Sequence, residues 1–360
     1  MNIGIPKERR SFEFRVGLSP AGVQILHQDG HTVFVEHDAG KGAGFDDKEY
    51  EEAGARIVFS AEEAFGRADM VLKVARPMDD ELPFLLTGSI LVGLLTLPSA
   101  RQNMIDALLE KKITVIAGEQ ICEPDGTMPI LRALSQIGGA MAAEVAGRLL
   151  ENNQGGRGIL LGGIPGVPPA EVVILGAGTV GTYAAKAFIG LGAHVTVLDR
   201  DMKALQRITQ NCAGSAVVTM LSTERNIVRC CEFANVLVGA VLVPGSRAPV
   251  LVSRETVRKM KDRSVIIDLS IDEGGCVETS RPTMHDRPSY IEEGVIHYCV
   301  PNMPGVVART ATHAYVNVAM PYIQKIAKLG AEKAISESPA IEAAVNMHKG
   351  ELRHLYSWMK

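Results

Sequence analysis

Apolar residues follow two alternating patterns along the chain. Short apolar runs bounded by turn residues are typical of buried strands, and longer stretches with apolar residues at helical spacing are typical of amphipathic helices. In the first part of the chain they predict strands at residues 2–5, 32–35, 70–74, 89–94 and 113–117, and helices at 19–29, 47–55, 61–68 and 100–111. This alternation of strand and helix predicts an α/β domain with a largely parallel sheet.

The same alternation resumes in the second part of the chain. It predicts strands at residues 172–175, 195–198, 216–219, 235–239, 264–268 and 295–300, and helices at 182–191, 202–212, 224–231 and 253–261. Two longer stretches, residues 128–152 and 308–329, predict long helices that connect two domains, and we expect Pro321 to break or delay the second. The Gly- and Pro-rich but apolar segment 155–169 predicts a constrained hairpin or loop.

A glycine-rich turn follows the strand predicted at residues 172–175. Its glycines, Gly176, Gly178 and Gly181, form a G-x-G-x-x-G motif between a strand and a helix. In a dinucleotide-binding Rossmann unit the first glycine makes the tight turn, the second lets the backbone approach a pyrophosphate, and the third lets helix and strand pack closely. The helix start, at Thr179 and Val180, would present unpaired N–H groups to the phosphates.

An acidic residue, Asp199, ends the next predicted strand, at the spacing at which such units bind the adenosine ribose. Its carboxylate would repel a 2′-phosphate, which favours NAD over NADP as cofactor. The neighbouring Arg200 weakens this preference slightly. The motif with its strand, helix and acid therefore predicts an NAD site.

Composition and charge narrow the class of protein further. The chain has 360 residues, 46% of them hydrophobic and 22% charged, and a formal net charge of −4. This length predicts two domains, and the negative charge argues against a nucleic-acid partner. We find no targeting segment and no apolar run long enough for a membrane span. The six cysteines lack metal-ligand spacing, so we expect reduced thiols, no metal and a cytoplasmic protein.

Several motifs in order along the chain resemble one family. They are residues 4–8 (GIPKE), 14–16 (FRV), 19–23 (SPAGV), 154–158 (QGGRG), 162–167 (GGIPGV), 239–245 (GAVLVPG), 272–276 (DEGGC) and 302–304 (NMP). With the glycine-rich turn, they make the chain similar throughout to the alanine dehydrogenase family, which also includes the NAD-binding part of proton-translocating transhydrogenase.

The resemblance implies the overall organisation of the molecule. It implies an α/β fold of two Rossmann-like domains with parallel sheets that flank a cleft and are linked by long helices. Residues 1–129 with 307–360 would form the substrate domain, and residues 130–306 the NAD-binding domain. It also implies a small-molecule partner, an amino acid or 2-oxo acid, and a homohexamer.

The resemblance also implies roles for particular residues. Arg15 matches the arginine that binds the substrate carboxylate, which a planar guanidinium can grip with two hydrogen bonds. Asp272 matches the acid beside the nicotinamide. Outside the family context, Arg15 would be a structural or solvated charge and Asp272 a turn cap.

Further residues match positions that contact the cofactor. They are Ser135, Val241, Leu242 and Asn302. Ser135 and Asn302 also have a structural interpretation, as hydrogen-bonding groups in a helix and in a turn.

Two positions depart from the family pattern. Alanine dehydrogenases have a substrate-binding lysine where this chain has Ala75, and an acid/base histidine where it has Thr96. Neither replacement exchanges a proton near pH 7. Lys73 is on the same strand face as Ala75. It could take over the role of the family's lysine and histidine, or it could be structural. Arg76 is expected to point to the opposite face.

These residues lead to two hypotheses. The first is an NAD-dependent amino-acid dehydrogenase that catalyses reversible oxidative deamination, or reduction of the related imine, with a substrate preference different from alanine's. The second is a non-catalytic or transhydrogenase-like NAD(H)-binding module, which the residues 75–78 (ARPM) favour. Arg15 argues for the first hypothesis, because such a module has no carboxylate to bind.

Overall fold

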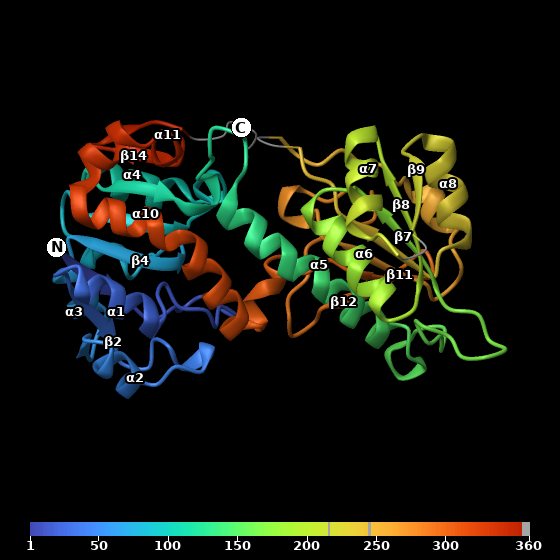
Figure 1. The fold of residues 1–360 in the computed structure, drawn as a ribbon, viewed down its shortest axis with the longest axis horizontal. Helices are drawn as coiled ribbons and strands as arrows, with labels where there is room; N and C mark the ends of the chain where they lie inside the picture. Colours follow the sequence, from blue (N-terminus) through green and yellow to red (C-terminus); the bar gives the residue numbers. More distant parts are fainter. Residues whose placement is uncertain (215–216, 244–245, 355–360) are drawn as a thin grey trace. The chain divides into compact units, whose positions relative to one another are not determined.

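The protein folds into two compact units. The computed structural model describes residues 1–214, 217–243 and 246–354. Unit 1 consists of Met1–Leu134 and Pro304–Lys360, and unit 2 of Ser135–Met303. Each unit has one sheet with helices packed around it (Figure 1).

The sheet of unit 1 has the strand order β15-β14-β6-β5-β4-β1-β2-β3. Its strands are β1 (Asn2–Ile5), β2 (Thr32–Glu36), β3 (Arg56–Val58), β4 (Met70–Ala75), β5 (Ile90–Leu94), β6 (Thr114–Ala117), β14 (Val345–His348) and β15 (Glu351–Leu352). Strands β1 to β6 are parallel to one another, and β14 pairs antiparallel with β6. The order along the sheet reverses between β1 and β4, which is where open α/β sheets bind ligands.

Four helices connect these strands, and the sequence predicted each of them. They are α1 (Pro20–Gln28), α2 (Asp47–Glu52), α3 (Ala61–Gly66) and α4 (Gln102–Glu110). Ser19 caps α1 by accepting a hydrogen bond from the N–H of Gly22, and Asp46 forms a capping box with Glu49 at the start of α2. The short strands β3, β14 and β15 were not predicted.

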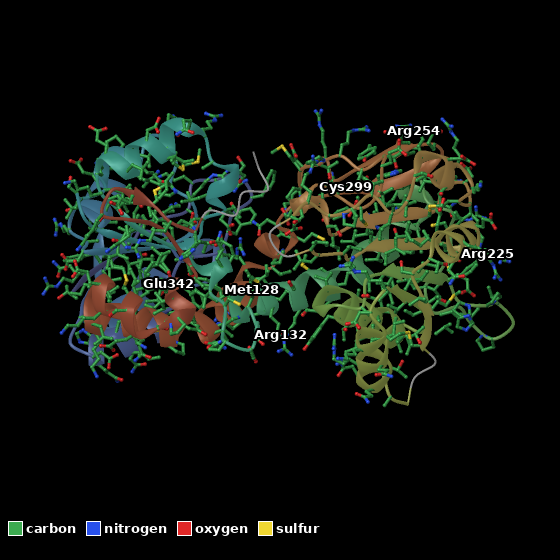
Figure 2. All side chains as sticks on the ribbon, turned by 90° about the horizontal axis from the view of Figure 1, so that it is seen from above. Met128, Arg132, Arg225, Arg254, Cys299 and Glu342 are labelled. Carbon is green, nitrogen blue, oxygen red and sulfur yellow. The ribbon has the colours of Figure 1, made fainter. Side chains whose placement is uncertain are left out.

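The two long helices are α5 (Pro129–Leu149) and α10 (Ala308–Glu337). Met128 and Arg132, labelled in Figure 2, bracket the start of α5. The expected break of α10 at Pro321 was wrong, because the proline lies inside the helix and the kink is at Gly330, with φ 76° and ψ 166°. Buried apolar side chains on both sides of Pro321 hold the helix in place there, whereas glycine adopts the left-handed φ of the kink without a Cβ clash.

The sheet of unit 2 has the order β12-β13-β11-β10-β7-β8-β9, and all its strands are parallel except β12. They are β7 (Glu171–Leu175), β8 (His194–Asp199), β9 (Val217–Leu221), β10 (Val236–Gly239), β11 (Val265–Asp268), β12 (Ser289–Glu292) and β13 (Val295–Tyr298). The helices are α6 (Thr179–Gly190), α7 (Met202–Asn211), α8 (Glu224–Phe233) and α9 (Arg254–Arg258). Strand order reverses between β7 and β10, as expected for a Rossmann unit. The first residue of the strand predicted at 216–219, Ala216, lies outside the described residues.

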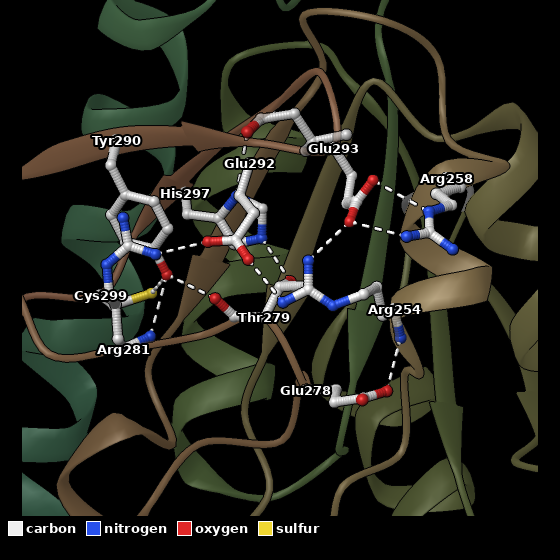
Figure 3. A network of polar contacts seen from close by, with 11 residues as sticks. Arg254, Arg258, Glu278, Thr279, Arg281, Tyr290, Glu292, Glu293, His297 and Cys299 are labelled. Carbon is white, nitrogen blue, oxygen red and sulfur yellow. Dashed lines mark hydrogen bonds and ion pairs between the residues drawn. The ribbon is translucent and has the colours of Figure 1, made fainter.

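A network of charged and aromatic side chains fastens the antiparallel edge of unit 2 (Figure 3). Arg254 of α9 forms ion pairs of 2.6 Å with both Glu292 and Glu293. The guanidinium of Arg281 also pairs with Glu292 and lies 3.6 Å from the ring centre of Tyr290. Isolated surface ion pairs stabilise little, but this network joins α9 and the segment at Arg281 to the edge strand β12.

The segment 155–169 contains a short hairpin, as its Gly- and Pro-rich sequence predicted. Ile164 and Val167 exchange backbone hydrogen bonds of 3.1 and 2.8 Å. Across the described ranges, no helix has the length and apolar character that a membrane crossing requires.

Candidate functional site

The glycine-rich turn of unit 2 lies at the point where strand order reverses, and two of its glycines are required by the fold. A Cβ on Gly176 would lie 2.2 Å from the carbonyl oxygen of Ala240, and the φ of Gly176 is 108°. A Cβ on Gly181 would lie 1.9 Å from the carbonyl oxygen of Gly176. Both distances are far below van der Waals contact, so no larger residue fits at either position.

Gly178 has no such reason to be glycine. A Cβ there would meet no protein atom within 4 Å, and its φ of −72° suits any residue. No side chain among the described residues caps α6 at Gly178, so the first N–H groups of the helix, at Thr179 and Val180, remain for another acceptor. An open glycine at an uncapped helix start fits a dinucleotide pyrophosphate.

The carboxylate of Asp199 fastens the end of β8 to this turn. One oxygen accepts a hydrogen bond of 2.7 Å from the N–H of Ala177, and the other accepts one of 2.8 Å from Asp201. Asp199 is partly buried and Arg200 is exposed. The acid therefore lies beside the glycine-rich turn, as expected for a ribose-binding residue.

A buried acid that the sequence analysis did not single out organises the loop after β11. Asp268 accepts hydrogen bonds from the N–H groups of Ser270 (3.1 Å), Cys276 (2.9 Å) and Val277 (3.3 Å). The hydroxyl of Ser270 in turn accepts a bond of 2.8 Å from the N–H of Val241. Asp268 thus joins the ends of β10 and β11. In the sequence, only its position at the end of an apolar strand could have indicated this role.

The loop held by Asp268 carries Asp272. This acid is exposed, and one of its oxygens lies 3.5 Å from the N–H of Asn302. The next residue, Glu273, is half-buried, and burial together with the charge of Asp272 raises its pKa to about 7. This end of the loop therefore concentrates acidic groups beside Asn302.

The remaining predicted cofactor residues also belong to unit 2. Ser135 lies on α5 and is half-buried, and Leu242 is half-exposed just after Val241. Pro244 and Gly245, in the motif at residues 239–245, lie outside the described residues. Unit 2 thus gathers the glycine-rich turn, Asp199, Val241 and Asp272 at the carboxyl ends of four strands.

The predicted substrate residues belong to unit 1. Arg15 is only 4% exposed, and Glu13 binds its guanidinium through two hydrogen bonds, 2.7 Å from Nε and 2.6 Å from Nη2. This carboxylate neutralises a buried cation and fixes the plane of its guanidinium. Glu13 was not predicted, and only its position two residues before Arg15 could have indicated it.

Lys73, in β4, is enclosed by carboxylates. Its ammonium is 3.3 Å from both Glu8 and Glu81, and its side chain is 1% exposed. Burial raises the pKa of Glu8 to about 7 against the opposing effect of Lys73. Lys73 therefore serves at least as the counter-ion of two buried acids.

The two positions at which the sequence analysis expects a departure from the family pattern lie at adjacent strand ends. Ala75 ends β4 and is buried, and Thr96 follows β5 in the left-handed region, with φ 40°. A β-branched residue there costs about 1–3 kcal/mol. Arg76 contacts Thr96: its Nη1 donates to the carbonyl oxygen (3.2 Å) and the hydroxyl (3.0 Å). Because β4 ends at Ala75, strand alternation does not determine where Arg76 points.

Glu119 supports the turn at Thr96 from the other side. Its carboxylate accepts hydrogen bonds from the N–H groups of Leu95 (3.1 Å) and Thr96 (2.6 Å). Burial raises the pKa of Glu119 to about 7 despite these bonds. The residue follows β6 and was not predicted, because nothing in its own segment links it to a turn so distant in the sequence.

One group of side chains in the described residues has metal-ligand chemistry. Ligand atoms of His37, Asp38 and Asp47 lie within 4.8 Å of one another near the surface of unit 1. Asp47 accepts hydrogen bonds from His37 and from the N–H of Asp38, so this cluster already has internal partners.

The glycine geometry gives a paired prediction. Gly178→Ala should leave thermal stability close to that of the wild type but weaken NADH binding at least about tenfold, because its methyl group enters only the space that a pyrophosphate would need. Gly181→Ala should instead lower the melting temperature, because its methyl group strikes the backbone of Gly176. Calorimetric titration with NADH and a melting curve for each variant test both. Unchanged NADH binding in Gly178→Ala would contradict the assignment.

Comparison with known proteins places these units in one family. The profile of the alanine dehydrogenase/PNT N-terminal domain matches residues 4–138, and that of the C-terminal domain matches residues 142–355. The chain is 44% identical to an alanine dehydrogenase of Methanococcus maripaludis, over 98% of this chain and 95% of that protein. It is 43% identical to an "Alanine dehydrogenase 2" of Staphylococcus aureus, over 98% of this chain and 94% of that protein.

Solved structures give the same relationship. An L-alanine dehydrogenase structure superimposes with a TM-score of 0.95 and 44% identity, covering 98% of this chain and 97% of the other. A transhydrogenase from Sinorhizobium meliloti has a TM-score of 0.84 but 24% identity, covering 98% and 99% of the two chains, and so shares the fold. With both domain profiles and full-length relatives in agreement, the chain belongs to the alanine dehydrogenase/PNT family.

Proposed function

We propose that the protein is an NAD-dependent amino-acid dehydrogenase, which converts an L-amino acid reversibly to a 2-oxo acid or reduces the related imine. The observation that carries the proposal is Gly178, an open glycine at an uncapped helix start where strand order reverses. Relatives named alanine dehydrogenase, at 44% identity over nearly the whole length, support the reaction class.

On the cofactor side, residues of unit 2 would bind the cofactor and orient it. Bound NAD supplies the hydride acceptor. The N–H groups of Thr179 and Val180 would hold the pyrophosphate, and Asp199 the adenosine ribose, which favours NAD over NADP although Arg200 is adjacent. The further residues toward the nicotinamide would be Ser135, Val241, Leu242, Asp272 and Asn302. Residues 130–306 would thus form the NAD-binding domain.

On the substrate side, residues 1–129 and 307–360 would form the substrate domain. Arg15 would bind the α-carboxylate, with its orientation fixed by Glu13. Lys73, held between Glu8 and Glu81, would support the end of β4 from within. Ala75 and Thr96, with shorter side chains than the family's lysine and histidine, would leave room for a substrate other than alanine.

The alternative is an NAD(H)-binding module without an organic substrate. Residues 75–78 favour it, whereas the buried, preorganised Arg15 favours the enzyme. NADH binding without turnover on any amino acid, or on any oxo acid with ammonium, would decide for the module.

A homo-oligomer, with six subunits as the family resemblance implies, is part of the same proposal. The hairpin segment leaves Leu160, Ile164 and Val167 exposed, at 66%, 61% and 55%, and apolar side chains so exposed in one short segment suit a subunit contact. Light scattering should give a mass near six chains, and a monomer would exclude the assembly.

A cytoplasmic location completes the proposal, and recovery of the native protein from a membrane or secreted fraction would contradict it.

The role of Arg15 gives a direct prediction. Arg15→Lys keeps the charge but loses the two-bond grip, so kcat/KM for the amino acid should fall about 10- to 100-fold while the affinity for NADH stays unchanged. Steady-state kinetics with the best amino acid of a broad panel measure this effect. Arg67→Lys, a surface change in the same unit, is the matched control. Equal kcat/KM for Arg15→Lys and wild type would remove Arg15 from the substrate site.

A further inference from the structure

Three arginines gather at the carboxyl end of the unit 1 sheet, where strand order reverses. Arg10 lies in the segment that follows β1, and Arg76 directly follows β4. Arg101 precedes α4, shortly after the turn at Thr96 that ends β5. Strands β1, β4 and β5 are neighbours in the sheet, so all three segments leave it on one edge.

Arg76 is held through one nitrogen only. Its Nη1 donates to the hydroxyl and carbonyl oxygens of Thr96 and, at 2.7 Å, to the hydroxyl of Ser99. In the part of the chain that the structure describes, its Nε and Nη2 donate to no protein atom, and no carboxylate forms an ion pair with it. The guanidinium is therefore fixed in place with donors still available.

The charge around Arg76 is not balanced. Burial, and then the positive charges of Arg10 and Arg101, lower the pKa of Arg76 from its ordinary value, while the smaller effect of Glu119 opposes them. Within the described ranges, the side chain of Arg10 makes no ion pair, and Arg101 pairs only with exposed Asp79 at 3.5 Å. Glu119 uses its oxygens on backbone N–H groups. Among the described residues neither Arg76 nor Arg10 has an ion-pair partner, and positive charges so close to one another favour an anion at this place.

The side chains beside Arg76 are short or carry hydroxyl groups. Ala75 extends no side chain beyond its Cβ, and the hydroxyls of Thr96 and Ser99 are held beside the guanidinium. Arg15 is a separate guanidinium, bound by Glu13. Unit 1 thus offers one cation that we assign to the α-carboxylate and a second cationic group with no assigned ligand.

We propose that Arg76, assisted by Arg10 and Arg101, binds a second anionic group of the substrate. The substrate would then be an amino acid or 2-oxo acid whose side chain ends in a carboxylate, sulfonate or phosphate. This inference rests on the proposed dehydrogenase function and deepens it. The shorter residues at 75 and 96 and the added cation at 76 are then parts of one specificity pocket.

The test compares anionic amino acids with neutral partners of similar size. Binding to the enzyme–NADH complex, which cannot oxidise them, is measured for aspartate against asparagine, glutamate against glutamine, and cysteate and O-phosphoserine against serine. Turnover with NAD is measured for the same pairs. At least one anionic member should be preferred about 10- to 100-fold in both assays, and the preferred member tells which anion is used. Equal or tighter binding of every neutral partner would overturn the proposal.

Two variants separate the role of Arg76 from damage to the fold. Arg76→Gln, which keeps a donor for Thr96, should reduce the anionic-to-neutral preference about 10- to 100-fold. Arg10→Gln, which removes a charge with no ion-pair partner among the described residues, should reduce it about two- to fivefold, and more at low salt. Arg67→Gln is the matched control and should leave the preference unchanged. An unchanged preference in both Arg76→Gln and Arg10→Gln would overturn the assignment.

The binding assay keeps this inference separable from the proposed function. An Arg76-dependent preference for anions without any turnover would support the anion subsite and reject the dehydrogenase. Turnover of neutral amino acids with no preference for anions would support the dehydrogenase and reject the anion subsite.

Discussion

The reversal of strand order in each sheet is the constraint on which the candidate site depends. In unit 1 the parallel strands follow one another outward on either side of the neighbouring pair β1 and β4. In unit 2 they do so on either side of the pair β7 and β10. The loops that leave the carboxyl ends of each pair diverge there and leave an edge that no helix of the sheet needs to cover. Each of the two edges carries polar and charged residues, several of them buried.

The two edges are built by different means. In unit 2, backbone contacts too close for any Cβ fix the glycine-rich turn against the end of β10. Asp199 holds this turn, and Asp268 holds the loop after β11, through hydrogen bonds from backbone N–H groups. In unit 1, charged side chains dominate. Glu13 holds Arg15, two acids enclose Lys73, and Glu119 and Arg76 support the strained turn at Thr96. The edge of unit 2 is thus fixed mainly by the backbone, while the edge of unit 1 is open to change by single side-chain substitutions.

This difference explains what could be predicted from the sequence. Glycine spacing and apolar runs are local, so they predicted the Rossmann unit, the turn at Gly176 to Gly181 and most strands. The pairing of Glu119 with the turn at Thr96, and of Asp268 with the loop that it holds, depends on tertiary contacts that no local pattern encodes. The strands β3, β12, β14 and β15 were not predicted, and β14 joins the sheet by pairing with β6, which is distant from it in the sequence. Pro321 misled the prediction because buried neighbours, and not the lost hydrogen bond, determine the path of α10.

The central proposal is that unit 2 binds NAD and that positions 75 and 96 of unit 1 determine the substrate specificity. The double substitution Ala75→Lys and Thr96→His tests it most directly, and histidine tolerates the left-handed conformation at position 96 better than threonine does. With NADH and ammonium, kcat/KM for pyruvate should rise about 10²- to 10⁴-fold, the typical contribution of a general acid or base, while NADH affinity stays the same. Unchanged pyruvate reduction in a folded, NADH-binding double variant would contradict the account.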